Sequence, residues 1–464
     1  MSTFSGLEIG NRALHANQKA LEVTSHNLSN AGTPGYSRQV VDMSATDPYT
    51  YPSFMGGKGA GQIGTGVEVK SILRVRDGLI DEQIRKENGL LGQWEGTRDT
   101  LNQMEMVMNE PSNAGLRESV DQFWTSLEEL SIHPHEEATR SAVRQQAITL
   151  TEDINHSYKQ LKDLRYNLNE QVKTQVSEVN KYTSQIGELN DQIVKVFSMG
   201  EQPNDLLDQR DDLLEKISKI INVTAFTDKV GQLNVSIGGR ALVVGANHYE
   251  LTTQRNDEDH GMVKILWAET SIQVEPSIGI LKGLVDVRDR NLPELMSNLD
   301  EYAGAIVTQM NEVHQKGFGL DQSTGNDFFT GTNAQDISVA EEILDDLNKI
   351  AASATGAPGN GEVALELANL KQQKLLVGSG ANMGDFIGSL VAKLGIESGV
   401  AKTKCDNQTL LINHLSSRRE SISGVSIDEE LTNMMKYQHG YNAAAKVITT
   451  VDEMLEVIIN GLKR

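Results

Sequence analysis

The chain has 464 residues, 38% of them hydrophobic, which is typical of a globular protein with two or three domains. Its formal net charge of -22 argues against nucleic acid or an anionic membrane as partner, because both are bound through clustered lysine and arginine. Cys405 is the single cysteine, so an internal disulfide is excluded, and we interpret it as a small packed side chain.

Membrane insertion and classical secretion are not expected either. The sequence contains no run of about 18 apolar residues, the length that a spanning helix requires. Glu8, Asn11 and Arg12 interrupt the region where a secretory signal needs an apolar core.

The N-terminal segment is expected to form a helix that ends near Asn30. The letters NLSNAGTPGYSRQ at 27–39 place two glycines and a proline within four residues, and these residue types terminate helices. Before this stop, leucines recur every seven residues beside a row of mostly small side chains: Leu7, Leu14, Leu21 and Leu28, with Gly6, Ala13, Ala20 and Asn27. This spacing predicts a packing stripe.

Residues 40–73 are rich in glycine, proline, tyrosine and threonine and predict irregular chain with short strands, of which TGVEVKSIL is the clearest. Periodic apolar residues then predict a series of helices, at about 75–109, 112–131, 136–199 and 204–221. From 222 to 282 the pattern changes to short β-rich runs, including LNVSI and MVKILWA, which predict antiparallel strands. Helices are expected again at 284–316, 336–349, 362–376 and 384–423, with a glycine-rich loop, KGFGLDQSTGNDFF, after the first of them.

The C-terminal segment carries a heptad pattern of about five repeats. Its first row is Ile427, Met434, Tyr441, Ile448, Leu455 and Leu462, and its second row is Leu431, Gln438, Ala445, Asp452 and Ile459. Ser426 with Glu429 forms a capping box for the start of this helix. The pattern alone leaves two interpretations open, an internal coiled-coil pair between the two termini or a surface for assembly.

The expected fold is mainly α with an inserted β domain. Because the β segment interrupts helical chain, the helices on its two sides are expected to come together in one bundle. We divide the chain into a terminal coiled-coil domain, a long-helix bundle with short β elements and an inserted antiparallel β domain: residues 1–40 with 424–464, residues 41–221 with 284–423, and residues 222–283.

Three motifs that suggest ligand chemistry have simpler structural interpretations. GAGQIG at 59–64 fits a dinucleotide loop, but it precedes a strand instead of opening a helix. Asp205, Asp208 and Asp212 are typical of an acidic helix start, and His133 with His135 lacks the third and fourth ligands that zinc needs. We expect no cofactor, no metal and no enzyme, an expectation that a deep pocket with converging titratable groups would reverse.

Tyr36-Ser37-Arg38 closes the opening motif and is equally consistent with a recognition site or with a turn that covers a helix end. The stretches ALEVTSHNLSNAGTPGYSRQ and GVSIDEELTNMMKYQHGYNAAAKVITTVDEMLEVIIN resemble the termini of the axial proteins of the bacterial flagellum, the family of rod, hook and hook-associated proteins. Two internal stretches are similar to the hook-associated branch of this family, which forms the first junction between hook and filament: PNDLLDQRDDLLEKISKIINV and IGTGVEVKSILRVRD. Residues 317–380 do not obviously match, so an outer domain that some relatives carry there is expected to be absent or reduced.

This resemblance implies a structural junction protein that is exported unfolded through the flagellar type III channel and assembles at the hook tip. It further implies that the terminal helices line the axial channel as an inner coiled-coil layer, with the helical bundle around them and the β domain outermost. The implied inner-layer residues are Leu7, Leu14, Leu21, Leu28, Ile427, Leu431, Met434, Tyr441, Ile448 and Leu455. The family motif corresponds to Asn27, Asn30, Gly32, Pro34, Gly35, Tyr36 and Arg38.

The partners implied by the resemblance are further copies of the chain in a ring or helix, the hook protein, a second junction protein, the filament and an export chaperone. The chaperone is expected to hold Ile448, Leu455, Ile458, Ile459 and Leu462 in the cytoplasm before export to the extracellular flagellum. The alternatives are a hook or rod protein, a coiled-coil regulatory module that stays in the cytoplasm, and an enzyme.

Overall fold

The computed structural model describes residues 3–47, 64–109, 115–259, 261–374 and 382–461. The chain forms two compact units: the first unit comprises residues 1–89, 178–250 and 409–464, and the second comprises 90–177 and 251–408. Both units combine segments from the two halves of the sequence, as the interrupting β segment predicts. The three-part division of the sequence groups the residues differently and stays a prediction about the assembled protein. The motif GAGQIG lies almost entirely outside the described residues.

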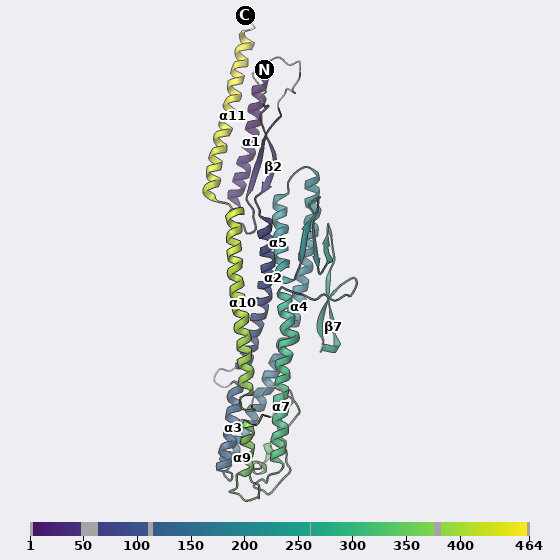
Figure 1. Cartoon of the computed structure of the whole chain (residues 1–464), viewed down its shortest axis with the longest axis vertical. Helices are drawn as coiled ribbons and strands as arrows, with labels where there is room; N and C mark the ends of the chain where they lie inside the picture. Colours follow the sequence, from purple (N-terminus) through teal and green to yellow (C-terminus); the bar gives the residue numbers. More distant parts are fainter. Residues whose placement is uncertain (1–2, 48–63, 110–114, 260, 375–381, 462–464) are drawn as a thin grey trace. The chain divides into compact units, whose positions relative to one another are not determined.

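Helices make up most of the described chain, which confirms the expected fold class. They are α1 Thr3–Ser29, α2 Gly78–Asn109, α3 Leu116–Ile132, α4 Glu137–Ser198, α5 Asn204–Ile220, α6 Ile280–Asp286, α7 Leu292–His314, α8 Glu341–Asp345, α9 Glu362–Asn369, α10 Phe386–Ser423 and α11 Ile427–Gly461 (Figure 1). A π-helical turn at Val287–Asn291 joins α6 to α7, and 3-10 turns lie at Asp257–Asp259, Leu347–Lys349 and Leu370–Gln372.

The strands are antiparallel throughout, as predicted, and they form separate small sheets. Their bounds are β1 Gln39–Ala45, β2 Val67–Arg74, β3 Thr224–Thr227, β4 Leu233–Ile237, β5 Arg240–Val244, β6 Asn247–His248, β7 Leu251–Asn256, β8 Met262–Trp267, β9 Phe329–Thr330 and β10 Ser338–Val339. β1 pairs with β2, β3 to β6 form a four-stranded meander in the first unit, and β7 pairs with β8 in the second unit.

One expected helix, at 336–349, is largely wrong. Ser338 and Val339 pair as β10 with β9, and only Glu341–Asp345 is α-helical. The reason is a side chain: the Asp336 carboxylate accepts the backbone N–H groups of Thr332 and Asn333, at 2.8 and 2.9 Å, and so closes a turn where a helix would have to start.

The core of the second unit is built around aromatic side chains. Phe123 on α3 packs edge-on against Phe329, with 5.7 Å between ring centroids, and Tyr302 on α7 stacks on Phe386 of α10 at 5.6 Å. All four rings are buried. Such a cluster removes a large apolar area from water and so stabilises this unit.

Candidate functional site

α1 ends at Ser29, where the glycines and proline of the opening motif predict its end. Beyond it, Thr33 N–H donates to the Asn30 carbonyl at 2.9 Å, and Tyr36 N–H donates to the Thr33 carbonyl at 3.2 Å. Gly35 has a φ of +80°, a left-handed angle that a side chain would strain. The two tight turns reverse the chain, so that the residues after the turn return to the last turn of α1.

Asn27 is the centre of this arrangement and is 1% exposed. Its amide nitrogen donates to the Gln39 carbonyl at 2.8 Å and to Glu430 Oε2 at 3.1 Å. Its amide oxygen accepts from the Tyr36 hydroxyl at 2.8 Å and from Gln39 N–H at 3.0 Å. Both donors and both acceptor positions of the amide are therefore used, which only an asparagine of this orientation achieves.

Tyr36 lies over the end of α1. Its ring meets the His26 ring at an angle of 65°, and its hydroxyl lies 3.0 Å from His26 Nδ1. Burial raises the pKa of Tyr36, and the nearby carboxylates of Asp205, Asp208 and Glu430 raise it further. The phenol consequently stays protonated and serves as a hydrogen-bond donor.

Arg38 connects this turn to the far end of the sequence. Its guanidinium donates to Glu430 Oε1 at 2.8 Å and to Glu429 Oε2 at 3.0 Å, and its backbone N–H donates to the Ser423 carbonyl at 2.9 Å. Glu429 and Glu430 lie in the first turn of α11. A carboxylate there is favoured by the helix dipole, and the guanidinium adds the charge partner that burial of Glu430 demands.

Ser37 and Gln39 connect the same turn to α5. Asp208 on α5 accepts Ser37 N–H at 2.9 Å and the Ser37 hydroxyl at 2.7 Å. Asp205 accepts from Gln39 Nε2 at 2.7 Å, and Asn204 Nδ2 donates to Gln39 Oε1 at 3.1 Å. We call Asn27 and residues 36–39, with these partners on α5 and α11, the joint.

Three arginines and four carboxylates extend the joint into a buried ionic network. Arg74 at the end of β2 contacts Asp208 at 2.6 Å and Asp211 at 3.0 Å, and Arg76 contacts Asp211 and, at 3.1 Å, Asp81 of α2. The other members are Arg419 of α10 and Glu215 of α5, which form an ion pair. Burial raises the pKa of Glu215, although Arg419 opposes this shift.

The acidic row of α5 stands out in the sequence, but its partners do not. The row is a helix start, as interpreted, and its members bind Ser37, Gln39, Arg74 and Lys216. The sequence RVRD at 74–77 could have indicated these partners, because its two arginines match the excess of acidic residues in DLLDQRDD.

α1 lies along α11 in the first unit (Figure 1), and small side chains make their contact. A Cβ placed on Gly10 would stand 2.9 Å from Ile448 Cγ1, and one on Gly440 would stand 2.5 Å from Asn17 Oδ1. These approaches show an antiparallel pair held close by glycine. The most buried positions on α1 are likewise small or medium in size: Gly10, Ala16, Ala20, Val23, Thr24 and Asn27.

The leucines of the expected stripe, Leu7, Leu14, Leu21 and Leu28, are half-buried, beside the more buried small row. On α11, four members of the first heptad row are half-buried, namely Met434, Tyr441, Ile448 and Leu455. Within one chain the buried or half-buried companions of this row are Glu430, Tyr437, Ala444 and Val451, and the second heptad row stays a prediction. In that second row Leu431, Gln438, Asp452 and Ile459 are exposed and Ala445 is half-buried, and Ile427 is exposed too, since α1 covers the adjacent side of the helix.

The C-terminal third of α11 keeps an apolar surface open. Val447, Met454, Val457, Ile458 and Ile459 are all exposed, by 46 to 74%. Two of these, Ile458 and Ile459, belong to the set expected to bind a chaperone, together with half-buried Ile448 and Leu455. Leu462 lies outside the described residues.

The remaining sequence candidates have structural roles. His133, Pro134 and His135 form the loop between α3 and α4, where the Pro134 carbonyl accepts from buried Arg140 at 2.8 Å. Cys405 is buried on α10 and accepts a hydrogen bond from Arg98 at 3.0 Å. Among the described residues, no group of histidine, cysteine or carboxylate side chains has the arrangement of a metal site.

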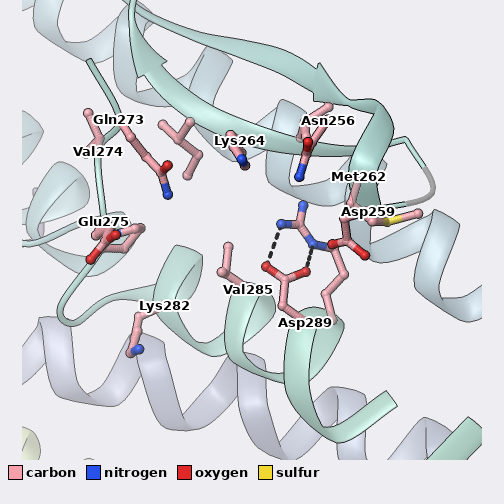
Figure 2. A pocket seen from close by; sticks show the side chains of 14 residues that line it. Asn256, Asp259, Met262, Lys264, Gln273, Val274, Glu275, Lys282, Val285 and Asp289 are labelled. Atoms are coloured by element: carbon pink, nitrogen blue, oxygen red, sulfur yellow. Dashed lines mark hydrogen bonds and ion pairs between the residues drawn. The ribbon is translucent and has the colours of Figure 1, made fainter. Parts of the chain in front are cut away.

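A pocket of about 290 Å³ lies in the second unit between β8 and α6 (Figure 2). Asp289 forms two hydrogen bonds with the Arg288 guanidinium, at 2.6 and 2.9 Å, and Lys282 pairs with Asp286 at 2.7 Å. Lys264, Gln273 and Glu275 are exposed at its rim. The lining described here contains no histidine, cysteine or serine, and the buried charges neutralise each other, so this pocket offers no nucleophile with an adjacent base.

None of the described helices combines the length and apolar character needed to cross a membrane.

Three family models match the chain. Residues 101–329 match the helical domain of the flagellar hook-associated protein FlgK, 7–36 match the flagella basal body rod protein, and 417–461 match the C-terminal part of the flagellar basal body rod FlgEFG proteins. A solved structure described as the flagellar hook junction protein FlgK from Burkholderia pseudomallei superposes with a TM-score of 0.65 at 16% identity. It covers 74% of this chain and 100% of its own, and it supports the fold alone.

Relatives cover almost the whole sequence. The flagellar hook-associated protein 1 of Bacillus subtilis is 35% identical over 500 aligned positions, which include 99% of each chain. The protein of the same name from Salmonella typhimurium is 25% identical, over 96% of this chain and 98% of its own. These relatives are structural proteins, which confirms the expectation that the chain is not an enzyme. By this similarity along its full length, the chain belongs to the family of flagellar hook-associated protein 1, a structural component of the external flagellum.

Proposed function

We propose that this chain connects the flagellar hook to the filament, as an adaptor that assembles at the tip of the hook. The observation that carries the proposal is the joint, which fastens the end of α1 and the start of α11 to one another and to α5. The two ends of the sequence thereby become one structural element whose outer apolar side chains remain available to neighbours. The names of the relatives, hook-associated and hook junction protein, support the location.

In this proposal α1 and α11 form the inner coiled-coil layer around the axial channel, the long helices surround them, and residues 222–283 face outward. Half-buried leucines at 7, 14, 21 and 28 and exposed Ile427 and Leu431 then meet other copies of the chain. The further partners are the hook protein on one side, and the second junction protein and the filament on the other.

The chain reaches this place by export in an unfolded state through the flagellar type III channel. A single buried cysteine suits such a route, since no disulfide has to be broken or formed. Before export, a chaperone covers the apolar residues near the C-terminus, including Ile458 and Ile459. Removal of residues 445–464 should abolish chaperone capture in a pull-down, and undiminished capture by the shortened chain would refute this part.

Deletion of the gene tests the junction function. Cells without this chain should build hooks that carry no filament and should release filament subunits into the medium. A tag on the restored chain should appear, by immunogold microscopy of isolated flagella, in one band at the hook–filament boundary. Full-length filaments on the deletion strain, or a tag that stays in the cytoplasm, would contradict the proposal and favour a cytoplasmic regulator.

A further inference from the structure

A second pocket of the second unit, of about 340 Å³, lies between α4 and α7. α4 contributes Tyr158, Lys162 and Tyr166, which are spaced four residues apart on one side of the helix. The buried side chain of Met262 from β8 lines the space between the two helices. The wall on the side of α7 also follows helical spacing and consists of Pro293, Met296, Ser297 and Asp300.

The two helices run antiparallel along this pocket. Burial raises the pKa of Tyr158, and its neighbour Asp300 on α7 raises it further. Arg165 Nε donates to the carbonyl of Arg288, which lies just before α7, at 3.0 Å. Higher residue numbers on α4 therefore meet lower residue numbers on α7. From Tyr158 to Tyr166 the helix advances roughly 12 Å, so the pocket is elongated along the helix axes.

One end of the pocket is apolar and aromatic. Tyr166 is 43% exposed, Pro293 is half-buried and Met262 is 2% exposed, so a ring and two apolar side chains surround this end. Aromatic rings and methionine sulfur both make favourable contacts with a further aromatic ring. The volume is near the lower limit for ligand pockets and suits one ring with a short polar chain.

The middle of the pocket offers one free cation. Asp300 accepts the backbone N–H of Ala334 at 2.9 Å, and Arg165, whose side chain is 9% exposed, pairs with Asp259 at 2.6 Å. Lys162 is half-buried, and no hydrogen bond or ion pair joins its ammonium to any of the residues that the structure describes. The charge that the protein leaves unpaired in this pocket is therefore positive.

We propose that this pocket binds an aromatic carboxylate, with the ring against Tyr166 and the carboxylate on the Lys162 ammonium. A carboxylate suits the pocket better than a phosphate group, because a phosphate brings about 1.5 to 2 negative charges and Arg165 already has a carboxylate of its own. The chemistry is shared by a free aromatic acid and by a protein segment in which an aromatic residue precedes an acidic one. This inference goes beyond the proposed function and does not depend on it.

A ligand-observed NMR titration of the purified full-length chain tests the site. The first probe is N-acetylphenylalanine, which has one ring and one carboxylate and should bind with a Kd of about 1 mM, the affinity expected for its size. N-acetylphenylalanine amide keeps the ring without the charge and should bind about tenfold more weakly. Acetate keeps the charge without the ring and should show no saturable binding.

Two variants assign the binding to this pocket. Lys162→Gln should weaken N-acetylphenylalanine about tenfold and leave the amide unchanged, so that the two probes become alike. Lys159→Gln is the matched control, because Lys159 is exposed on the same helix and does not line the pocket. Tyr166→Ala should weaken both ring-bearing probes about threefold or more. Thermal transitions followed by tryptophan fluorescence verify that the second unit of each variant is folded.

The outcomes decide both the site and its ligand. Equal binding of acid and amide by the unmodified chain would overturn the role of Lys162, and binding that neither Lys162→Gln nor Tyr166→Ala changes would overturn the pocket. So would the absence of binding. A capped dipeptide of phenylalanine and aspartate distinguishes the two sources: tighter binding than N-acetylphenylalanine indicates a protein segment, and weaker binding indicates a free acid.

Discussion

Replacement of Asp208 by alanine should loosen the joint more than any other single change on α5. The Asp208 carboxylate is 6% exposed and accepts two hydrogen bonds from Ser37 and one from Arg74. Arg74 keeps Asp211 as a partner at 3.0 Å, but Ser37 is left with a buried N–H and hydroxyl that nothing accepts. Loss of one member of a buried pair costs about 3–5 kcal/mol, and the retained contact with Asp211 places our expectation near the lower end, about 3 kcal/mol.

Hydrogen exchange followed by mass spectrometry measures this loss locally, which matters because a chain of two units need not unfold in one step. Peptides covering residues 36–45 and 204–220 should exchange faster in Asp208→Ala by about two orders of magnitude, the equivalent of about 3 kcal/mol. Asp212→Ala is the matched control, since Asp212 is half-exposed and pairs with exposed Lys216 at 2.7 Å, and its effect should stay below about 0.5 kcal/mol. Equal protection in the two variants would refute the anchoring role of α5.

Four further results are expected. Gly10→Val should separate α1 from α11, because its Cβ alone would stand 2.9 Å from Ile448, and should remove the exchange protection that residues 5–20 gain in assembled flagella; retained protection of these residues in assembled flagella would disprove this close contact. Leu21→Asp should abolish filament attachment, because a carboxylate buried in the inner contact is costly. The unfolding transition of the second unit, followed by the fluorescence of the three tryptophans that all belong to it, should stay unchanged. Normal filaments on cells with Leu21→Asp would contradict this prediction. In the free monomer the backbone amides of residues 5–30 and 427–461 should exchange rapidly, because marginally stable helices depend on tertiary partners. Strong protection of these amides would contradict the prediction that the terminal helices are weakly ordered. Burial lowers the pKa of His314 to about 4, so as the pH falls the unfolded chain binds a proton before the folded chain does. The free energy of unfolding of the second unit should therefore be constant above pH 6.5 and fall by about 3 kcal/mol towards pH 4. Urea titrations of His314→Asn should lack this decrease between pH 6.5 and 4, and an identical decrease would exclude His314 as its source.

Local signals in the sequence were sufficient for most elements. The end of α1 at Ser29, and the starts and ends of α4 and α5, follow from breakers, caps and apolar spacing that act within a few residues. The helix expected at 336–349 failed because the side chain of Asp336 competes for backbone donors, an effect that apolar periodicity does not contain.

The sequence could not decide which side of α11 faces α1, for a different reason. Apolar spacing on α11 fits more than one pair of rows, and the row that faces α1 is decided by glycines and alanines such as Gly10 and Ala444, which carry little apolar signal. No local sequence pattern could predict the contacts of the joint. Asn27 and Glu430 are 403 positions apart, and Ser37 and Asp208 are 171 apart, so only the motif and the family resemblance marked that end of α1 as special.

The span of 403 positions between Asn27 and Glu430 also determines when the joint can form. Loop-closure entropy tolerates such a span, since each doubling of the length costs only about 0.6 kcal/mol. Until Glu430 has been synthesised, the Asn27 amide lacks one acceptor and the Arg38 guanidinium lacks its buried carboxylate. The joint of the first unit therefore forms only after residue 430 is available, and a fragment that ends before Glu430 cannot close it.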